Sequence, residues 1–94
     1  MLNADTHRRT PRMDIAWRSN ALDHPRFGII VPRFGQNAVR RNRLRRQVRE
    51  LTRRKVLPRV QFIDIVIRTR PAAYRVPVAA MASDLEQWLG TLPR

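Results

Sequence analysis

Short apolar runs separated by turn-forming residues predict two strands in the first third of the chain. Residues 13–20 show a short, mixed pattern with Ile15 and Trp17 on one face of a possible strand, and residues 27–31 are rich in β-formers. Asp23 and Pro25 supply turn chemistry between the two segments. We therefore expect residues 13–31 to form a β-hairpin.

A helix is predicted to follow over residues 38–55. Asn37 stands directly before it, and asparagine is a favoured N-cap residue. The helix carries an apolar stripe at i, i+4 and i+7 spacing, formed by Leu44, Val48 and Leu51. Such a narrow stripe requires a core against which it can pack.

Residues 61–68 give the strongest strand pattern of the chain. Three isoleucines point to one side, and Phe62 and Val66 alternate with them on the other. Because both faces are apolar, we expect an interior strand. Helical spacing then predicts a last helix over 78–89, so the predicted order is β-β-α-β-α.

Residues 1–12 are polar and basic, with little to bury, and we expect a flexible basic tail followed by a single domain over 13–94. The chain contains no cysteine, which excludes disulfides and thiolate-bound zinc. No apolar run approaches the ~20 residues needed to span a bilayer, and no secretion signal begins the chain. We expect a cytoplasmic protein with no membrane partner.

Charge changes the picture more than any other property of the composition. Twenty Lys and Arg against seven Asp and Glu give a net charge of +13. Such a field repels itself unless a polyanion shares the space. Lys55 is the only lysine, and guanidinium groups suit phosphates and base stacking. Codon usage explains the preference for Arg over Lys equally well, but not the net charge.

The predicted long helix concentrates this charge, with eight arginines in the fifteen residues 40–54. Glu50 is the only acid among them, so i, i+4 repulsion has little to offset it. A face of this kind is held together most naturally by phosphates, and we predict that it binds nucleic acid. The candidate RNA-binding residues are Arg40, Arg41, Asn42, Arg43, Arg45, Arg46, Arg49 and Arg53.

The spacing of these residues carries a family resemblance. An Arg-Asn-Arg triplet at 41–43 precedes a basic pair at 45–46 and a further Arg49. The flanking runs His-Pro-Arg-Phe-Gly at 24–28 and Asp-Ile-Val-Ile at 64–67 fit the same pattern. This arrangement resembles the RNR signature of the bacterial ribonuclease P protein family, and the likeness covers residues 13–90.

The resemblance implies an α+β two-layer sandwich like domain 2 of ribosomal protein S5, with a left-handed βαβ crossover. General chain physics favours a right-handed one. It further implies the protein subunit of ribonuclease P, which binds a catalytic RNA and the 5′ leader of precursor tRNA and assists endonucleolytic removal of that leader. The nuclease chemistry and the Mg²⁺ then belong mainly to the RNA partner, and no DNA partner is expected.

In this family a cleft between the sheet and an N-terminal helix holds the leader. Here only twelve residues, none of them aromatic, precede Met13, so we expect that helix to be absent or the true start to lie upstream. The candidate cleft residues are Trp17, Phe62 and Val66. Core packing remains an equally good interpretation of Trp17 and Phe62. Without a covering helix, the cleft face of the sheet should stay partly open.

The chain offers no recognisable catalytic apparatus or metal-ligand spacing, since its carboxylates are scattered and it has only two histidines, His7 and His24. We therefore expect no catalytic residues and no protein-bound metal. Two alternatives stay open: a small toxin-like ribonuclease using His24 and arginines, and a ribosome-associated or DNA-binding module that uses the helix as a groove reader.

Overall fold

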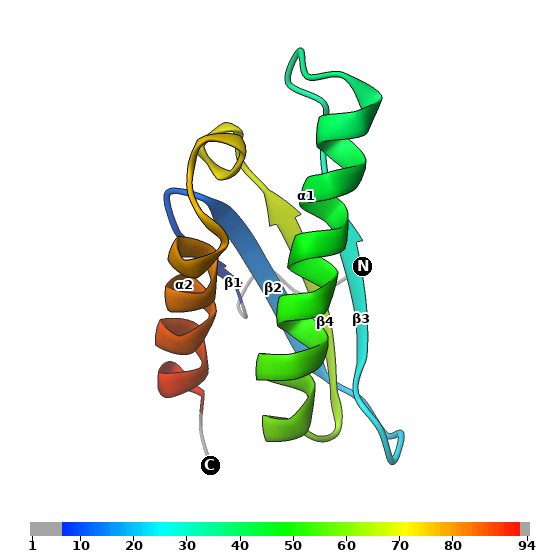
Figure 1. Ribbon diagram of the computed structural model, residues 1–94. Coiled ribbons are helices and arrows are strands. Elements are labelled where there is room, and N and C mark those ends of the chain that lie inside the picture. The colour runs from blue at the N-terminus through cyan, green and yellow to red at the C-terminus, as the bar shows by residue number, and fades with distance from the viewer. Residues whose placement is uncertain (1–6, 93–94) are drawn as a thin grey trace.

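The computed structural model describes residues 7–92 and shows a four-stranded sheet with two helices packed on one of its faces (Figure 1). The elements are β1 (His7–Arg9), β2 (Met13–Ser19), β3 (Arg26–Ile30), α1 (Ala38–Leu51), β4 (Ile63–Thr69) and α2 (Val78–Thr91). A π-helical turn (Thr52–Val56) and a 3-10 turn (Leu57–Arg59) extend α1, and a second 3-10 turn (Pro71–Arg75) precedes α2. The α+β two-layer prediction is confirmed.

The strand order is β1-β2-β4-β3, which makes β4 an interior strand as its two apolar faces predict. It pairs antiparallel with β2 and parallel with β3. The predicted hairpin over residues 13–31 is therefore wrong, because β4 lies between its two strands. The isoleucines of β4 are best buried at the centre, with a hydrogen-bonded strand on each side.

The connection from β3 through α1 to β4 is left-handed. Figure 1 views the sheet from the helix side, with α1 in front of it and both parallel strands pointing upward. In this view β4 lies to the left of β3, the opposite of the usual arrangement. The crossover that the family resemblance implies is thus present.

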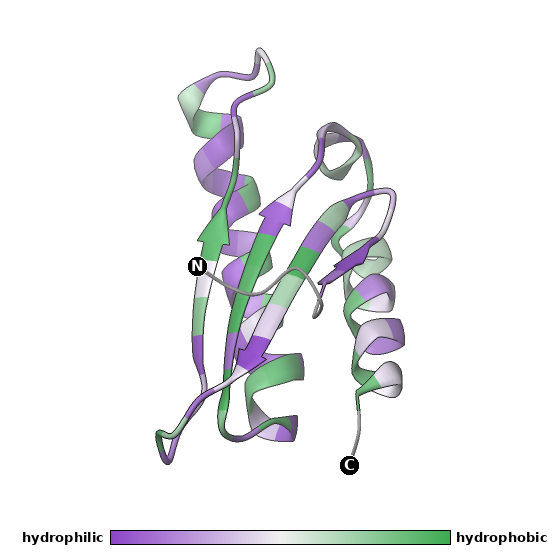
Figure 2. Cartoon of the chain, turned by 180° about the vertical axis from the view of Figure 1, so that it is seen from behind, coloured by the Kyte–Doolittle hydropathy of each residue, from purple (hydrophilic) through white to green (hydrophobic). Residues whose placement is uncertain are grey.

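The core fills the space between the sheet and the two helices. Its fully buried side chains include Met13, Ile15, Ile65, Ile67, Val48, Met81, Leu85 and Trp88. The opposite face of the sheet is covered by neither helix, as Figure 2 shows from behind. Strand pairing places Ala16, Val66 and Gly28 side by side on this open face. Within residues 7–92, the sheet is thus left open on the side where a cleft was expected.

Residues 7–12 correct the prediction of a flexible tail. His7–Arg9 pairs with β2 as an edge strand, and Thr10 is buried. Thr10 Oγ1 lies 3.0 Å from one carboxylate oxygen of Asp84, and Arg12 donates to the other oxygen at 3.0 Å. These contacts join the first strand to α2, so residues 7–12 belong to the domain. The remainder of the predicted tail, residues 1–6, lies outside the described residues.

Asp64 ties three strands together at one end of the open face. Arg26 of β3 donates twice to its carboxylate, at 2.9 and 2.7 Å. Asn20, after β2, donates to it at 2.8 Å. The Arg26 hydrogen bonds, followed by that of Asn20, hold the pKa of Asp64 well below its ordinary value. The charge of Asp64 on the central strand is therefore balanced by the hydrogen bonds that Arg26 and Asn20 donate to it.

The Asp84 contacts should contribute measurably to stability. Asp84→Ala leaves a buried hydroxyl and a half-buried guanidinium without their acceptor, and we expect it to lower the free energy of unfolding by about 2–3 kcal/mol. Glu86→Ala is the matched control on the same helix, because its 2.6 Å pair with Arg59 is exposed on both sides. It should cost less than about 1 kcal/mol in the same urea titration. Equal losses of unfolding free energy from the two variants would contradict a stabilising role for the Asp84 contacts with Thr10 and Arg12.

The Asp64 cluster predicts a defined pH dependence. Because its folded pKa lies below the unfolded value of about 4, its contribution is present above that pH and is lost as the pH falls through the folded pKa. Asp64→Asn should therefore destabilise the protein at pH 7, and its difference from wild type should shrink steadily below about pH 4. Arg26→Gln should likewise reduce the loss of unfolding free energy that wild type shows as the pH falls below about 4. A difference that stays constant across this range would show that Asp64 acts through packing alone.

Candidate nucleic-acid interface

The direction of the arginine helix is set at both ends and along its buried side. Asn37 caps α1, its Oδ1 accepting from the Arg40 N–H at 2.9 Å, as predicted. Leu44 and Val48 are buried in the core. At the C-terminal end, the Thr52 hydroxyl donates to the Val48 carbonyl at 2.8 Å. The buried Leu44, Val48 and Thr52 side chains leave the helix little freedom to rotate about its axis, so the outward-facing residues are fixed.

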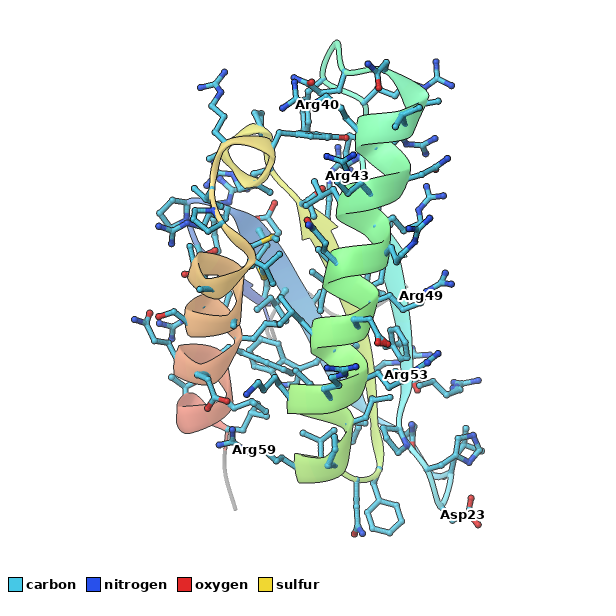
Figure 3. All side chains as sticks on the ribbon, viewed as in Figure 1. Asp23, Arg40, Arg43, Arg49, Arg53 and Arg59 are labelled. Carbon is cyan, nitrogen blue, oxygen red and sulfur yellow. The ribbon has the colours of Figure 1, made fainter. Side chains whose placement is uncertain are left out.

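The outward side of α1 is basic and exposed. Figure 3 views this side, and Arg43, Arg49 and Arg53 lie along it. The exposed members of the predicted set on this side are Asn42, Arg43, Arg46, Arg49 and Arg53. Glu50 approaches Arg53 and Arg54 only at 3.8 and 3.7 Å, contacts too long for good hydrogen bonds. Acidic screening of this surface by the helix itself is therefore weak.

Three arginines of the predicted set differ from the rest, since Arg40 and Arg41 contact other parts of the protein and Arg45 is half-buried. The Arg41 Nε donates to the Val31 carbonyl at 2.7 Å, which fastens the end of β3 to the helix. The Arg40 guanidinium lies over the Tyr74 ring at 6.0 Å and within 3.4 Å of the Tyr74 carbonyl. Arg45 is half-buried. The structural roles of Arg40 and Arg41 depend on the crossover and on the 3-10 turn before α2, which the helical pattern does not specify.

The structure places Trp17 and Phe62 along one hollow and Val66 apart from both, on the open face of the sheet. Trp17 lies on the helix side of the sheet, where its ring meets that of Trp88 edge-on at 5.5 Å, so its assignment to the cleft is wrong. Phe62 precedes β4 instead of lying within it, and borders a hollow beside the C-terminal end of α2. Val66 alone lies on the open face. The side of Trp17 follows from its pairing with Ile65, a register that sequence reasoning lacked.

The open face presents arginines that the sequence reasoning did not single out. Arg18 and Arg26 flank Asp64, and Arg68 stands further along β4 opposite Asp14. A shallow hollow is bordered by Arg18, Arg26, Gly28 and Val66. The alternation of side chains along β2, β3 and β4 could have located these arginines on one face. It does so only when the pairing of the three strands is known, because pairing decides which residues share a face.

Within residues 7–92, no cluster of three or more His, Asp or Glu side chains is placed to hold a metal ion. His24 sits in an exposed turn, its Nδ1 3.0 Å from an Asp23 oxygen, and this contact lowers the pKa of Asp23. Over the same residues, no helix is long and apolar enough to cross a membrane. The two features that could bind a ligand are therefore the basic face of α1 and the basic, open face of the sheet.

Comparison with known proteins places these features in a family. The family model for Ribonuclease P matches residues 1–93. The chain is 37% identical over 81 residues to the ribonuclease P protein component of Nitrosococcus oceani, covering 81% of this chain and 65% of that protein. It is 45% identical over 58 residues to that of Thermotoga maritima, covering 60% and 48%. The chain thus spans about two thirds or less of the length of these relatives.

Solved structures agree with the sequence relatives. The RNase P protein of Thermotoga maritima superposes with a TM-score of 0.79 at 29% identity, over 94% of this chain and 84% of that one. A Staphylococcus aureus RNase P protein mutant, described as defective in mRNA degradation activity, superposes with a TM-score of 0.78 at 27% identity, over 89% and 71%. By sequence and by fold, this chain belongs to the ribonuclease P protein component family.

Proposed function

We propose that this chain is the protein subunit of ribonuclease P and that it assists a catalytic RNA in removing the 5′ leader of precursor tRNA. The observation that carries the proposal is the outward face of α1, a fixed array of exposed arginines around Asn42. Each phosphate neutralised by such a side chain releases counterions and so favours binding. In this proposal the α1 face binds the catalytic RNA.

The open face of the sheet is the proposed site for the leader. Its floor is lined by the small or short side chains of Ala16, Gly28 and Val66, over which an extended strand of RNA fits closely. The arginines at 18, 26 and 68 supply positive charge at its margins. Among the described strands, the Phe and Trp side chains lie on the helix side, and the one ring on this face is the imidazole of His7, paired with Ala16 at the edge of the sheet. The leader is therefore held through its phosphates more than by base stacking, which favours little sequence preference.

The chemistry is assigned to the RNA partner, which holds the Mg²⁺ in this proposal. The chain supplies charge neutralisation and positioning, and it lowers the Mg²⁺ concentration that the RNA needs by taking over part of the phosphate screening. No residue of the described chain is assigned a catalytic role. The activity named for the Staphylococcus aureus neighbour makes cleavage by the protein alone the competing function to test.

Reconstitution tests the proposed function. The purified chain, the ribonuclease P RNA encoded by the same genome and precursor tRNA with a labelled leader are combined at low Mg²⁺. Cleavage at the mature 5′ end should require the RNA and be strongly accelerated by the protein. His24→Ala should leave this activity nearly intact, since its side chain sits in an exposed turn.

If the protein alone cleaves RNA, cleavage should need no RNA partner and should depend on His24. Protein that cuts RNA without any RNA partner, and loses that activity in His24→Ala at unchanged stability, would overturn the assignment and favour a toxin-like ribonuclease.

A further inference from the structure

The loop before α1 presents an exposed aromatic ring on a strained backbone. Gln36 donates its N–H to the Arg33 carbonyl at 2.8 Å and closes a tight turn. Both central residues are left-handed, Phe34 with φ 49° and Gly35 with φ 79°. Glycine and asparagine suit such turns, whereas a residue as large as phenylalanine is strained there. Burial does not explain the choice, because Phe34 is 44% exposed.

The surroundings of Phe34 favour RNA over an apolar protein partner. No acidic residue occurs from Val31 to Arg49, a stretch that holds seven arginines. Val39, in the first turn of α1, is 69% exposed, and Figure 2 shows apolar segments at this end of the helix. A polyanion with flat apolar surfaces complements both properties, and an unpaired nucleotide offers a phosphate and a base together.

We propose that Phe34 stacks on an unpaired base of the catalytic RNA, at the N-terminal end of the arginine face. This inference rests on the proposed function and adds to it a contact that is not electrostatic. Stacking accepts any base, because every base has a π-face. Strain is retained at Phe34 because the turn holds the ring away from the core and toward the ligand.

A second phenylalanine provides a matched control. Phe62 has φ 56° and is 53% exposed, but it precedes β4, at the end of the molecule opposite the start of α1 (Figure 1). Asparagine tolerates the left-handed conformation, so Phe34→Asn and Phe62→Asn should unfold at temperatures equal to or above that of wild type. Any difference between the two variants in RNA binding then reports the location of the ring, not the fold.

The test measures the affinity of each variant for the ribonuclease P RNA encoded by the same genome. Phe34→Asn should weaken binding about 5- to 150-fold, the range expected for one lost stacked base, while Phe62→Asn stays within about twofold of wild type. Phe34→Trp should bind the RNA about as tightly as wild type, unlike Phe34→Asn, and the fluorescence of the added tryptophan should be quenched by the RNA. The slope of log K against log salt should be the same for all three, because no charge is changed.

Several outcomes would overturn this inference. Equal affinities of Phe34→Asn and Phe62→Asn, or a Phe34→Trp variant that fails to restore binding, would remove the stacking role. A Phe34→Asn variant that abolishes self-association and leaves RNA affinity unchanged would assign the ring to a second copy of the chain. If wild type neither binds nor activates the RNA, the proposed function itself fails, which separates the two.

Discussion

The burial of one narrow stripe of α1 is the interaction on which the rest of the structure depends. Leu44 and Val48 are almost fully enclosed, and burial of each contributes about 1.5–3 kcal/mol. Against this stand repulsions between arginines three and four residues apart, each worth about 0.2–0.5 kcal/mol. Burial exceeds repulsion, so the helix persists without its ligand. The same burial directs the remaining arginines of α1 outward, where they form one exposed basic surface.

The sheet sets where that helix lies. β4 occupies the centre of the sheet, where β2 and β3 pair with its two edges. Its residues Ile65 and Ile67 are buried under the helices, whereas Val66 faces the open side. The left-handed crossover then lays α1 beside α2 on one face, and within residues 7–92 no helix covers the other face. The latch between Thr10, Arg12 and Asp84 holds the edge strand in place without covering that open face. Two basic surfaces on opposite sides of one thin domain are the result.

Local patterns were sufficient for both α-helices, for three of the four strands and for the arginine face. Helical spacing located α1 and α2, alternation located β4, and short runs of β-formers between turn residues located β2 and β3, each close to its observed bounds. Pairing was not predictable in the same way, because adjacent strands in sequence favour a hairpin and nothing local indicates that β4 inserts between them. Trp17 was misplaced for this reason. The three-residue strand β1 was missed because charged residues on an edge give no apolar alternation.

The account depends most on the claim that the outward arginines of α1 meet phosphates, and the salt dependence of RNA binding tests it most directly. The double variant Arg46→Gln/Arg49→Gln, measured against wild type, should flatten the slope of log K against log salt by roughly one to two units. Arg9→Gln/Arg59→Gln removes equal charge outside α1, from exposed ion-paired residues, and should flatten it less. Weaker binding with an unchanged slope in the α1 variant would contradict the account, because it would mean that these arginines act through folding and not through phosphate contact.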